Sequence, residues 1–188
     1  MIFAQWRARR ASKAVIEQIL GEIVAASRRP ALYAALGAPD RLDGRFELLT
    51  LHAGLVLRRL AALGGLADAM AQELIDSLFT HFDDTLREIG HSDVGVARRL
   101  KLMGSAFYGR AHAYAAALDS GSRAELTAVL ARNVYGAADA QAAARAAALA
   151  DYVASLDAAL AATPIEAFAT AQFRFPDHRI AAVGDFHD

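Results

Sequence analysis

Cysteine is absent from the 188 residues of this chain. Its absence excludes disulfides, zinc–thiolate sites, iron–sulfur clusters and cysteine nucleophiles. A reducing compartment is compatible with such a chain, but the lack of cysteine does not establish one. Long apolar runs are lacking too, since no window reaches the roughly 18 uninterrupted apolar residues of a membrane-spanning helix.

A large net charge is also missing, because the formal net charge is −1. Global electrostatics therefore give no argument for a nucleic-acid partner, and we expect no binding to DNA. The charges are nevertheless unevenly distributed. Residues 1–29 carry six Arg and Lys side chains against two acids, whereas residues 137–188 carry seven acids against three arginines. The basic beginning and the acidic end can contact different partners or each other.

Signatures of catalysis are not evident in the sequence. No Gly-x-x-x-x-Gly-Lys loop is present, and the serines stand mostly at predicted helix starts. His81, Asp84 and Glu88 share a helix face, which we interpret as a solvated acidic surface rather than a metal site. His52 lies on the apolar side of its helix, which favours a hydrogen-bonded core histidine. We therefore predict no catalytic residue, no metal ligand and no cofactor.

Helical periodicity is the dominant pattern that the chain does contain. Apolar residues recur at helical spacing over residues 16–24, 46–63, 66–89 and 96–118. Strand-like alternation is not found. The sequence therefore predicts an all-α, single-domain bundle of about six to eight helices with no sheet.

Capping residues and glycines predict where the helices begin and end. The expected boundaries are a first helix to about Ser27, a short helix from Pro30 to Leu36, helices that begin at Asp43, at Leu66 and at Ser92 or Asp93, and later helices capped by Ser122 and Thr163. We expect residues 1–136 to form the core, and residues 137–188 to add an alanine-rich helix, a short helix and a tail packed on the same domain. After Phe173 the tail is expected to be extended or disordered.

Two basic regions suggest contacts with partners. Arg98, Arg99 and Lys101 share a helical turn with Arg110 further along, which suits an anionic partner, although capping and solubility explain such charges equally. The first helix combines basic and bulky apolar residues, as interfacial membrane helices do. Its candidate membrane contacts are Phe3, Trp6, Arg7, Arg9, Arg10 and Lys13. The alternative is that its apolar stripe docks onto the bundle.

A series of short motifs between about Ile23 and Leu118 resembles the ubiquinol–cytochrome c chaperone family. The motifs are Leu32–Gly37 with Pro39-Asp40, Asp43–Glu47, Leu57–Leu60, Leu86–Glu88 with Gly90, Asp93–Val96, Lys101–Met103 and Phe107–Arg110. Several motifs in one order are more specific than any single motif. The alanine-rich C-terminal region matches less well.

The resemblance implies a non-enzymatic assembly factor for the respiratory cytochrome bc1 complex. It implies binding of newly made cytochrome b at the cytoplasmic face of the inner membrane, with possible contact to the ribosome near its exit tunnel. Helix-in-groove recognition would suit such a client. The candidate partner-binding residues are Asp43, Arg45, Arg98, Arg99, Lys101, Phe107, Tyr108 and Arg110. The alternatives are a peripheral membrane or lipid-binding module and an enzyme of a kind that the motifs do not reveal.

Overall fold

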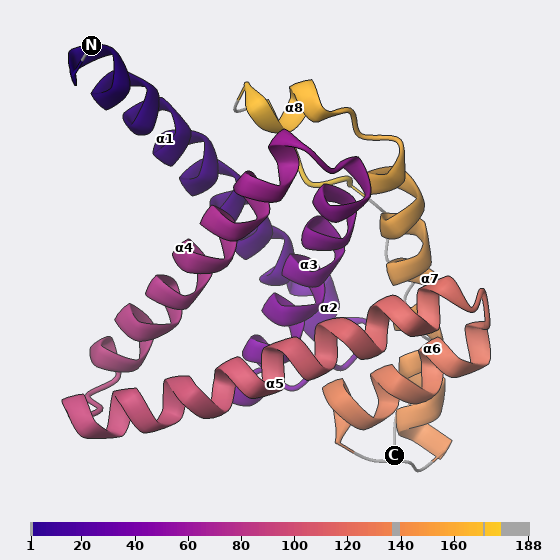
Figure 1. The fold of residues 1–188 in the computed structure, drawn as a ribbon. Helices are drawn as coiled ribbons and strands as arrows, with labels where there is room; N and C mark the ends of the chain where they lie inside the picture. Colours follow the sequence, from indigo (N-terminus) through magenta and orange to yellow (C-terminus); the bar gives the residue numbers. More distant parts are fainter. Residues whose placement is uncertain (1, 137–139, 171, 178–188) are drawn as a thin grey trace.

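The computed structural model describes residues 2–136, 140–170 and 172–177, with side chains from residue 13 onward. Its elements are α1 (Ile2–Ser27), α2 (Pro30–Ala34), α3 (Leu42–Leu63), α4 (Leu66–Glu88), α5 (Asp93–Asp119), α6 (Arg123–Leu130), the π-helical segment η1 (Ala131–Tyr135), α7 (Ala140–Ala161) and α8 (Ile165–Ala169). No strand occurs within these ranges. The predicted all-α bundle is thus confirmed (Figure 1).

Helix α3 is the centre of the bundle (Figure 1). It packs against α1, α4, α5, α7 and η1. Because neighbours surround it, every residue from Glu47 to Ala53 is buried. Two of these residues, Glu47 and His52, carry ionisable side chains into the core, where such groups require partners.

His52 finds its partners on α3 itself and on α7. Its Nδ1 lies 2.7 Å from the Leu48 carbonyl oxygen and its Nε2 lies 2.9 Å from the Tyr152 hydroxyl oxygen. Because a carbonyl can only accept, Nδ1 carries the hydrogen and Nε2 accepts from Tyr152. Burial lowers the pKa of His52 to about 4, so the ring is neutral at pH 7. The prediction of a hydrogen-bonded core histidine is confirmed.

The helix ends agree with the predicted caps in two places and differ in two. Ser92 and Ser122 accept hydrogen bonds from the backbone amides of α5 and α6, as expected. Asp43 was the wrong N-cap for α3, because the Arg41 carbonyl already accepts from the Arg45 amide and places Asp43 inside the first turn. Thr163 was also wrong, since its hydroxyl donates back to Ala159 of α7 and α8 begins only after Pro164.

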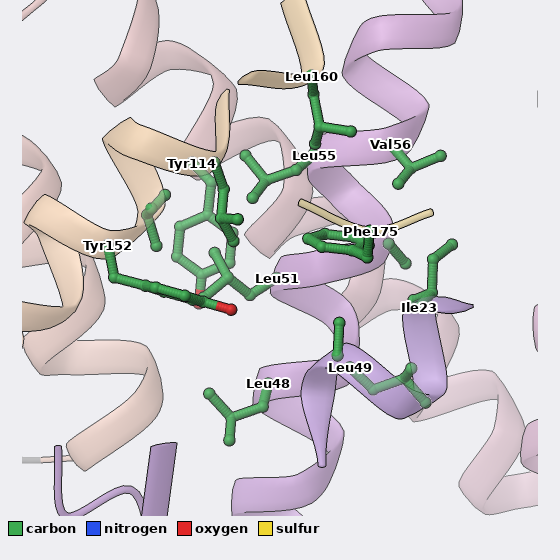
Figure 2. Close-up of a cluster of buried hydrophobic side chains, with 14 of the residues drawn as sticks. Ile23, Leu48, Leu49, Leu51, Leu55, Val56, Tyr114, Tyr152, Leu160 and Phe175 are labelled. Carbon is green, nitrogen blue, oxygen red and sulfur yellow. The ribbon is translucent and has the colours of Figure 1, made fainter. Parts of the chain in front are cut away.

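The segment after α8 forms neither helix nor strand over residues 172–177, and it docks on the bundle as far as Asp177. Phe173 and Phe175 are buried. The Gln18 side-chain amide donates to the Phe173 carbonyl at 2.6 Å, and the Phe175 amide donates to the Glu22 carboxylate at 3.0 Å. Figure 2 shows the Phe175 ring between Ile23 of α1 and the side chains of α3. The segment therefore fastens α1 to the core.

The alanine-rich helix α7 packs on α6, η1 and α3. It does so with a stripe of larger residues, including Leu149, Tyr152, Val153, Leu156 and Leu160, all of them buried. The hinge predicted near Gly136 to Gln141 falls largely on residues 137–139, outside the described ranges. The division at residue 136 stays a prediction.

Candidate partner-binding cleft

An open cleft of about 770 Å³ lies where three parts of the chain meet. One wall is the Pro39–Glu47 region at the start of α3, and the second is the Gly95–Arg110 part of α5. The third is η1 with Gly136, which follows α6. We refer to this feature as the arginine cleft, because arginine is its most frequent lining residue.

Backbone packing fixes the α3 wall. A Cβ atom on Gly44 would lie 2.0 Å from the Pro39 carbonyl oxygen, so only glycine allows the loop to lie this close to the helix. On the opposite side, the Tyr135 hydroxyl donates to the Leu36 carbonyl at 2.8 Å. The loop before α3 and the segment η1 are thereby held together, and the shape of the cleft follows from these two contacts.

An ion pair joins α3 and α5 at the base of the arginine cleft. Arg110 Nε lies 2.5 Å from Glu47 Oε2, so the guanidinium and the carboxylate form a close ion pair. Burial raises the pKa of Glu47, and the Arg110 guanidinium opposes that rise. The guanidinium carbon also lies 5.7 Å from the centroid of the Phe46 ring. The guanidinium of Arg110 therefore interacts mainly with residues of α3.

Four other arginines line the cleft without a carboxylate partner among the described residues. They are Arg41, Arg98, Arg99 and Arg132. Of these, Arg132 has a long contact of 3.5 Å to the Asn133 side-chain oxygen. The carboxylates in the lining are Asp43 and Glu47, and the charge of Glu47 is balanced by Arg110. The cleft is thus strongly positive, although the net charge of the chain is −1.

Apolar side chains lie beside these charges. Phe46, Met103 and Val134 contribute to the lining, and Leu102 stands out because 63% of its surface is exposed. Large apolar residues exposed beside unpaired cations form an amphipathic surface, which is typical of a site for another chain.

The structure brings together only part of the predicted partner-binding set. Asp43, Arg98, Arg99 and Arg110 line the arginine cleft. The other four residues lie outside that lining, and a part for them in binding stays a prediction.

Arg45 and Lys101 are the two charged residues of this second group. Arg45 is exposed at the surface, where it donates to Asp40 at 2.7 Å. Lys101 is exposed on α5, outside the lining of the cleft.

The aromatic members of the predicted set differ from each other in exposure. Phe107 is 1% exposed and belongs to the hydrophobic core, where it packs edge-on against Phe79. Tyr108 is 55% exposed and stacks on the same Phe79 ring, with centroids 6.2 Å apart. Phe107 therefore stabilises the core, whereas the Tyr108 ring is exposed and can contact a partner.

The predicted membrane contacts lie at the beginning of α1. The side chains of Phe3, Trp6, Arg7, Arg9 and Arg10 fall outside the described residues, so their contacts stay predictions. Lys13 is described, and its Nζ lies 3.6 Å from Glu17 on the same helix. The backbone of the first turns of α1 extends away from the other helices (Figure 1).

Sequence reasoning missed several residues of the arginine cleft. Glu47 was part of a recognised motif, and its position on an apolar helix face signals a buried carboxylate that needs a cation. Arg41 and Arg132 gave no such signal, because each is an isolated basic residue near a helix end. Only the tertiary structure places them opposite Arg98 and Arg99.

Within the described ranges, no group of three or more His, Asp and Glu side chains could hold a metal ion. No helix in the same ranges is long and apolar enough to cross a bilayer.

Comparisons with known proteins give two matches. The model of the ubiquinol–cytochrome C chaperone family matches residues 34–175, well beyond Leu118, where the expected resemblance ended. The crystal structure of the Cbp3 homolog from Brucella abortus is similar over 94% of this chain and 97% of that one, with 35% sequence identity and a TM-score of 0.83. No curated protein matches the chain.

Proposed function

Because this chain belongs to the ubiquinol–cytochrome c chaperone family, we propose that it is a non-enzymatic assembly factor of the cytochrome bc1 complex. Its client is the cytochrome b apoprotein, which it binds before insertion into the membrane. The arginine cleft is the binding site. The observation that carries this assignment is the combination of unpaired arginines with an exposed Leu102 in one cleft.

A chaperone site must cover an apolar segment and then release it. The arginine cleft is open and amphipathic, and its walls are fixed by Gly44 and Tyr135 rather than by the client. A preformed site loses little conformational entropy on binding. An open site allows the client to leave when a membrane or another subunit competes for it. The geometry therefore favours transient holding over catalysis.

The place of action belongs to the same proposal. We place the protein in the cytoplasm, peripherally at the inner membrane and close to the ribosomal exit tunnel, where newly made cytochrome b emerges. The basic beginning of the chain supports contact with either an anionic membrane or ribosomal RNA. No DNA partner and no cofactor are part of this role.

Site-directed photocrosslinking during translation tests the client and the site together. A photoreactive residue replacing Leu102, inside the cleft, is expected to crosslink cytochrome b in the native host. The matched control replaces Leu66, which is 68% exposed at the turn between α3 and α4 and does not line the cleft. Equal crosslinking from both positions, or none from Leu102, contradicts the proposed site.

Loss of the gene tests the function separately from the site. A deletion strain is expected to lose assembled bc1 complex and the absorbance of haem b, and the wild-type gene is expected to restore both. Normal levels of the bc1 complex in the deletion strain would contradict the assembly role.

A second candidate function is peripheral membrane binding through the beginning of α1. The observation in its favour is that the first turns of this helix extend beyond the bundle (Figure 1), in a segment rich in Arg and bulky apolar residues. Flotation with vesicles containing phosphatidylglycerol measures this activity. Replacing Arg7, Arg9 and Arg10 with Glu is expected to abolish flotation without affecting crosslinking at Leu102.

A further inference from the structure

We propose that the arginine cleft selects an acidic amphipathic segment of its client, about two helical turns long. The carboxylates of this segment bind the unpaired arginines, and its apolar side chains cover Leu102. This inference rests on the proposed function and deepens it, because it names the chemistry by which the client is recognised.

Charge complementarity supports an acidic occupant. Arg98 and Arg99 enter the cleft from α5, whereas Arg41 and Arg132 enter from the two other walls. None of the four has a carboxylate within ion-pair distance among the described residues, although seven other arginines form ion pairs with Asp or Glu there. Arginine forms paired hydrogen bonds with carboxylates, which adds geometric selection to attraction. A cationic or neutral segment would leave these charges uncompensated.

The surface of α5 strengthens the same argument. Between its terminal residues, Asp93 and Asp119, this 27-residue helix contains no acid. Its positive charges therefore lack the local i,i+4 partners that neutralise exposed cations on other helices, such as Arg87 with Asp83 on α4. A carboxylate of the client therefore finds no acid on this wall that already binds the arginines. The acids across the cleft are Asp43 and Glu47, and Glu47 is already paired with Arg110.

The size of the cleft sets the length of the segment. A helix about 10 Å wide with a pitch of about 5.4 Å fills roughly 420 Å³ per turn. The cleft volume of about 770 Å³ is close to that of two such turns, which is the part of the segment that the open cleft can cover. In two turns, residues spaced three or four apart share a face, so one face can present two carboxylates while the opposite face presents apolar side chains.

Leu102 and Met103 give the segment its apolar contact. Leu102 is 63% exposed and lines the cleft, while Met103 beside it is partly buried against the core. A flexible Met next to an exposed Leu adapts to apolar side chains of different shapes, as promiscuous binding surfaces do. The arginines thus select acidic segments, and the apolar contacts allow segments of different sequence to bind.

Three peptides of one sequence pattern provide the direct test. Each has 14 residues, is labelled with fluorescein and is helical and amphipathic, and the polar face carries Glu in the first, Gln in the second and Lys in the third. Fluorescence anisotropy with the full-length protein measures affinity. We expect the Glu peptide to bind at least about tenfold more tightly than the Gln peptide, and its affinity to fall as salt is raised.

Charge reversal on the protein locates the contact. The double variant Arg98→Glu with Arg99→Glu is expected to bind the Glu peptide at least about tenfold more weakly and to prefer the Lys peptide. Arg41→Glu with Arg132→Glu, on the other walls, is expected to do the same. Lys101→Glu is the matched control on the same helix, outside the cleft lining, and should change affinity less than about threefold. Circular dichroism verifies that each variant is folded.

Three results would overturn the proposal. The first is equal binding of the Glu and Gln peptides, because recognition would then be apolar only. The second is a Lys101→Glu effect as large as that of the cleft variants, which would move the site to the outer face of α5. The third is binding of phosphatidylglycerol vesicles that depends on Arg98 and Arg99 in the absence of peptide binding, which would make lipid the ligand.

The proposed function can fail independently. A deletion strain with a normal bc1 complex would remove the assembly role and leave the peptide result standing. If bc1 assembly requires the gene but tolerates Arg98→Gln with Arg99→Gln, then the assembly role stands and the charge-based recognition is wrong. The two failures therefore give different combinations of results.

Discussion

Glu47 of α3 and Arg110 of α5 form an ion pair beneath the arginine cleft, with the carboxylate almost fully buried and the guanidinium reaching the cleft wall. A buried charge is costly to leave without its partner, because the interior does not solvate it. The pair therefore makes the floor of the candidate site dependent on the packing of two helices.

Removing one member of this pair is expected to destabilise the fold. Arg110→Met should lower the free energy of unfolding by about 3 kcal/mol, because Glu47 is left buried and unpaired. Adding Glu47→Met should recover most of this loss, since no buried charge remains. Urea denaturation of the two single variants and the double variant measures the coupling.

The exposed Arg87, which bridges Asp83 and Asp93, provides the matched control. Arg87→Met should lower the free energy of unfolding far less than Arg110→Met, because solvent screens exposed pairs. A similar small loss for Arg110→Met would show that the cleft floor does not depend on the pair.

Two glycines give opposite predictions for the same substitution. Gly44→Ala should destabilise by at least about 2 kcal/mol and disturb the cleft, because its Cβ would lie 2.0 Å from the Pro39 carbonyl oxygen. Gly109→Ala on α5 should stabilise by up to about 1 kcal/mol, since nothing lies within 4 Å of the new Cβ. Thermal unfolding of both variants is the measurement. Equal effects would contradict the described packing at Gly44.

The helices themselves could be predicted from sequence, because their apolar residues repeat at the helical period over long segments. The prediction failed at local details that depend on neighbouring backbone. Asp43 has the chemistry of an N-cap, yet the preceding loop begins α3 earlier, at Leu42. The two glycines inside α5 also differ in ways that spacing does not reveal: a Cβ atom on Gly104 would lie 3.3 Å from the Phe79 ring, whereas one on Gly109 would meet nothing within 4 Å.

The candidate site was less predictable than the fold. Arg98 and Arg99 were visible as a basic cluster on one helix, and they do line the cleft. Arg41 and Arg132 come from other segments, and sequence spacing carries no information about which segments meet. Phe107 appeared in the same motif as Arg110, but a motif does not reveal that two residues three positions apart on a helix lie in the core and in the cleft lining respectively.

The buried His52 predicts a dependence of stability on pH. Its pKa is about 4 in the folded state and 6.5 for an unperturbed histidine, because burial disfavours the charged ring. Between these pH values the unfolded chain binds a proton that the folded protein does not. The free energy of unfolding should therefore fall as pH falls from 6.5 to 4, by about 3 kcal/mol in total.

Comparison of variants isolates this contribution from those of other groups. His52→Gln should flatten the slope of unfolding free energy against pH in this window, whereas His112→Gln, at an exposed position, should keep it. His81 contributes in the same direction, since burial also lowers its pKa. Identical slopes for the wild type and His52→Gln would contradict the assignment of the neutral, buried ring.

The last prediction concerns how α1 is held. Phe175 packs against His52 with ring centroids 5.2 Å apart, and its backbone amide donates to Glu22. Phe175→Ala should cost about 3 kcal/mol and should weaken the hold on α1 more than on the central helices. Hydrogen exchange at the α1 amides from Ile16 to Ser27 should accelerate more than exchange in α3. The segment's hydrogen bonds go to Gln18 and Glu22 of α1, whereas α3 is also held by four other elements besides α1. Tyr108→Ala, at an exposed aromatic position on α5, should leave both rates nearly unchanged. Equal acceleration in α1 and α3 after Phe175→Ala would contradict this prediction. It would mean that the whole bundle opens as one unit and that the segment after α8 contributes to global stability without holding α1 separately.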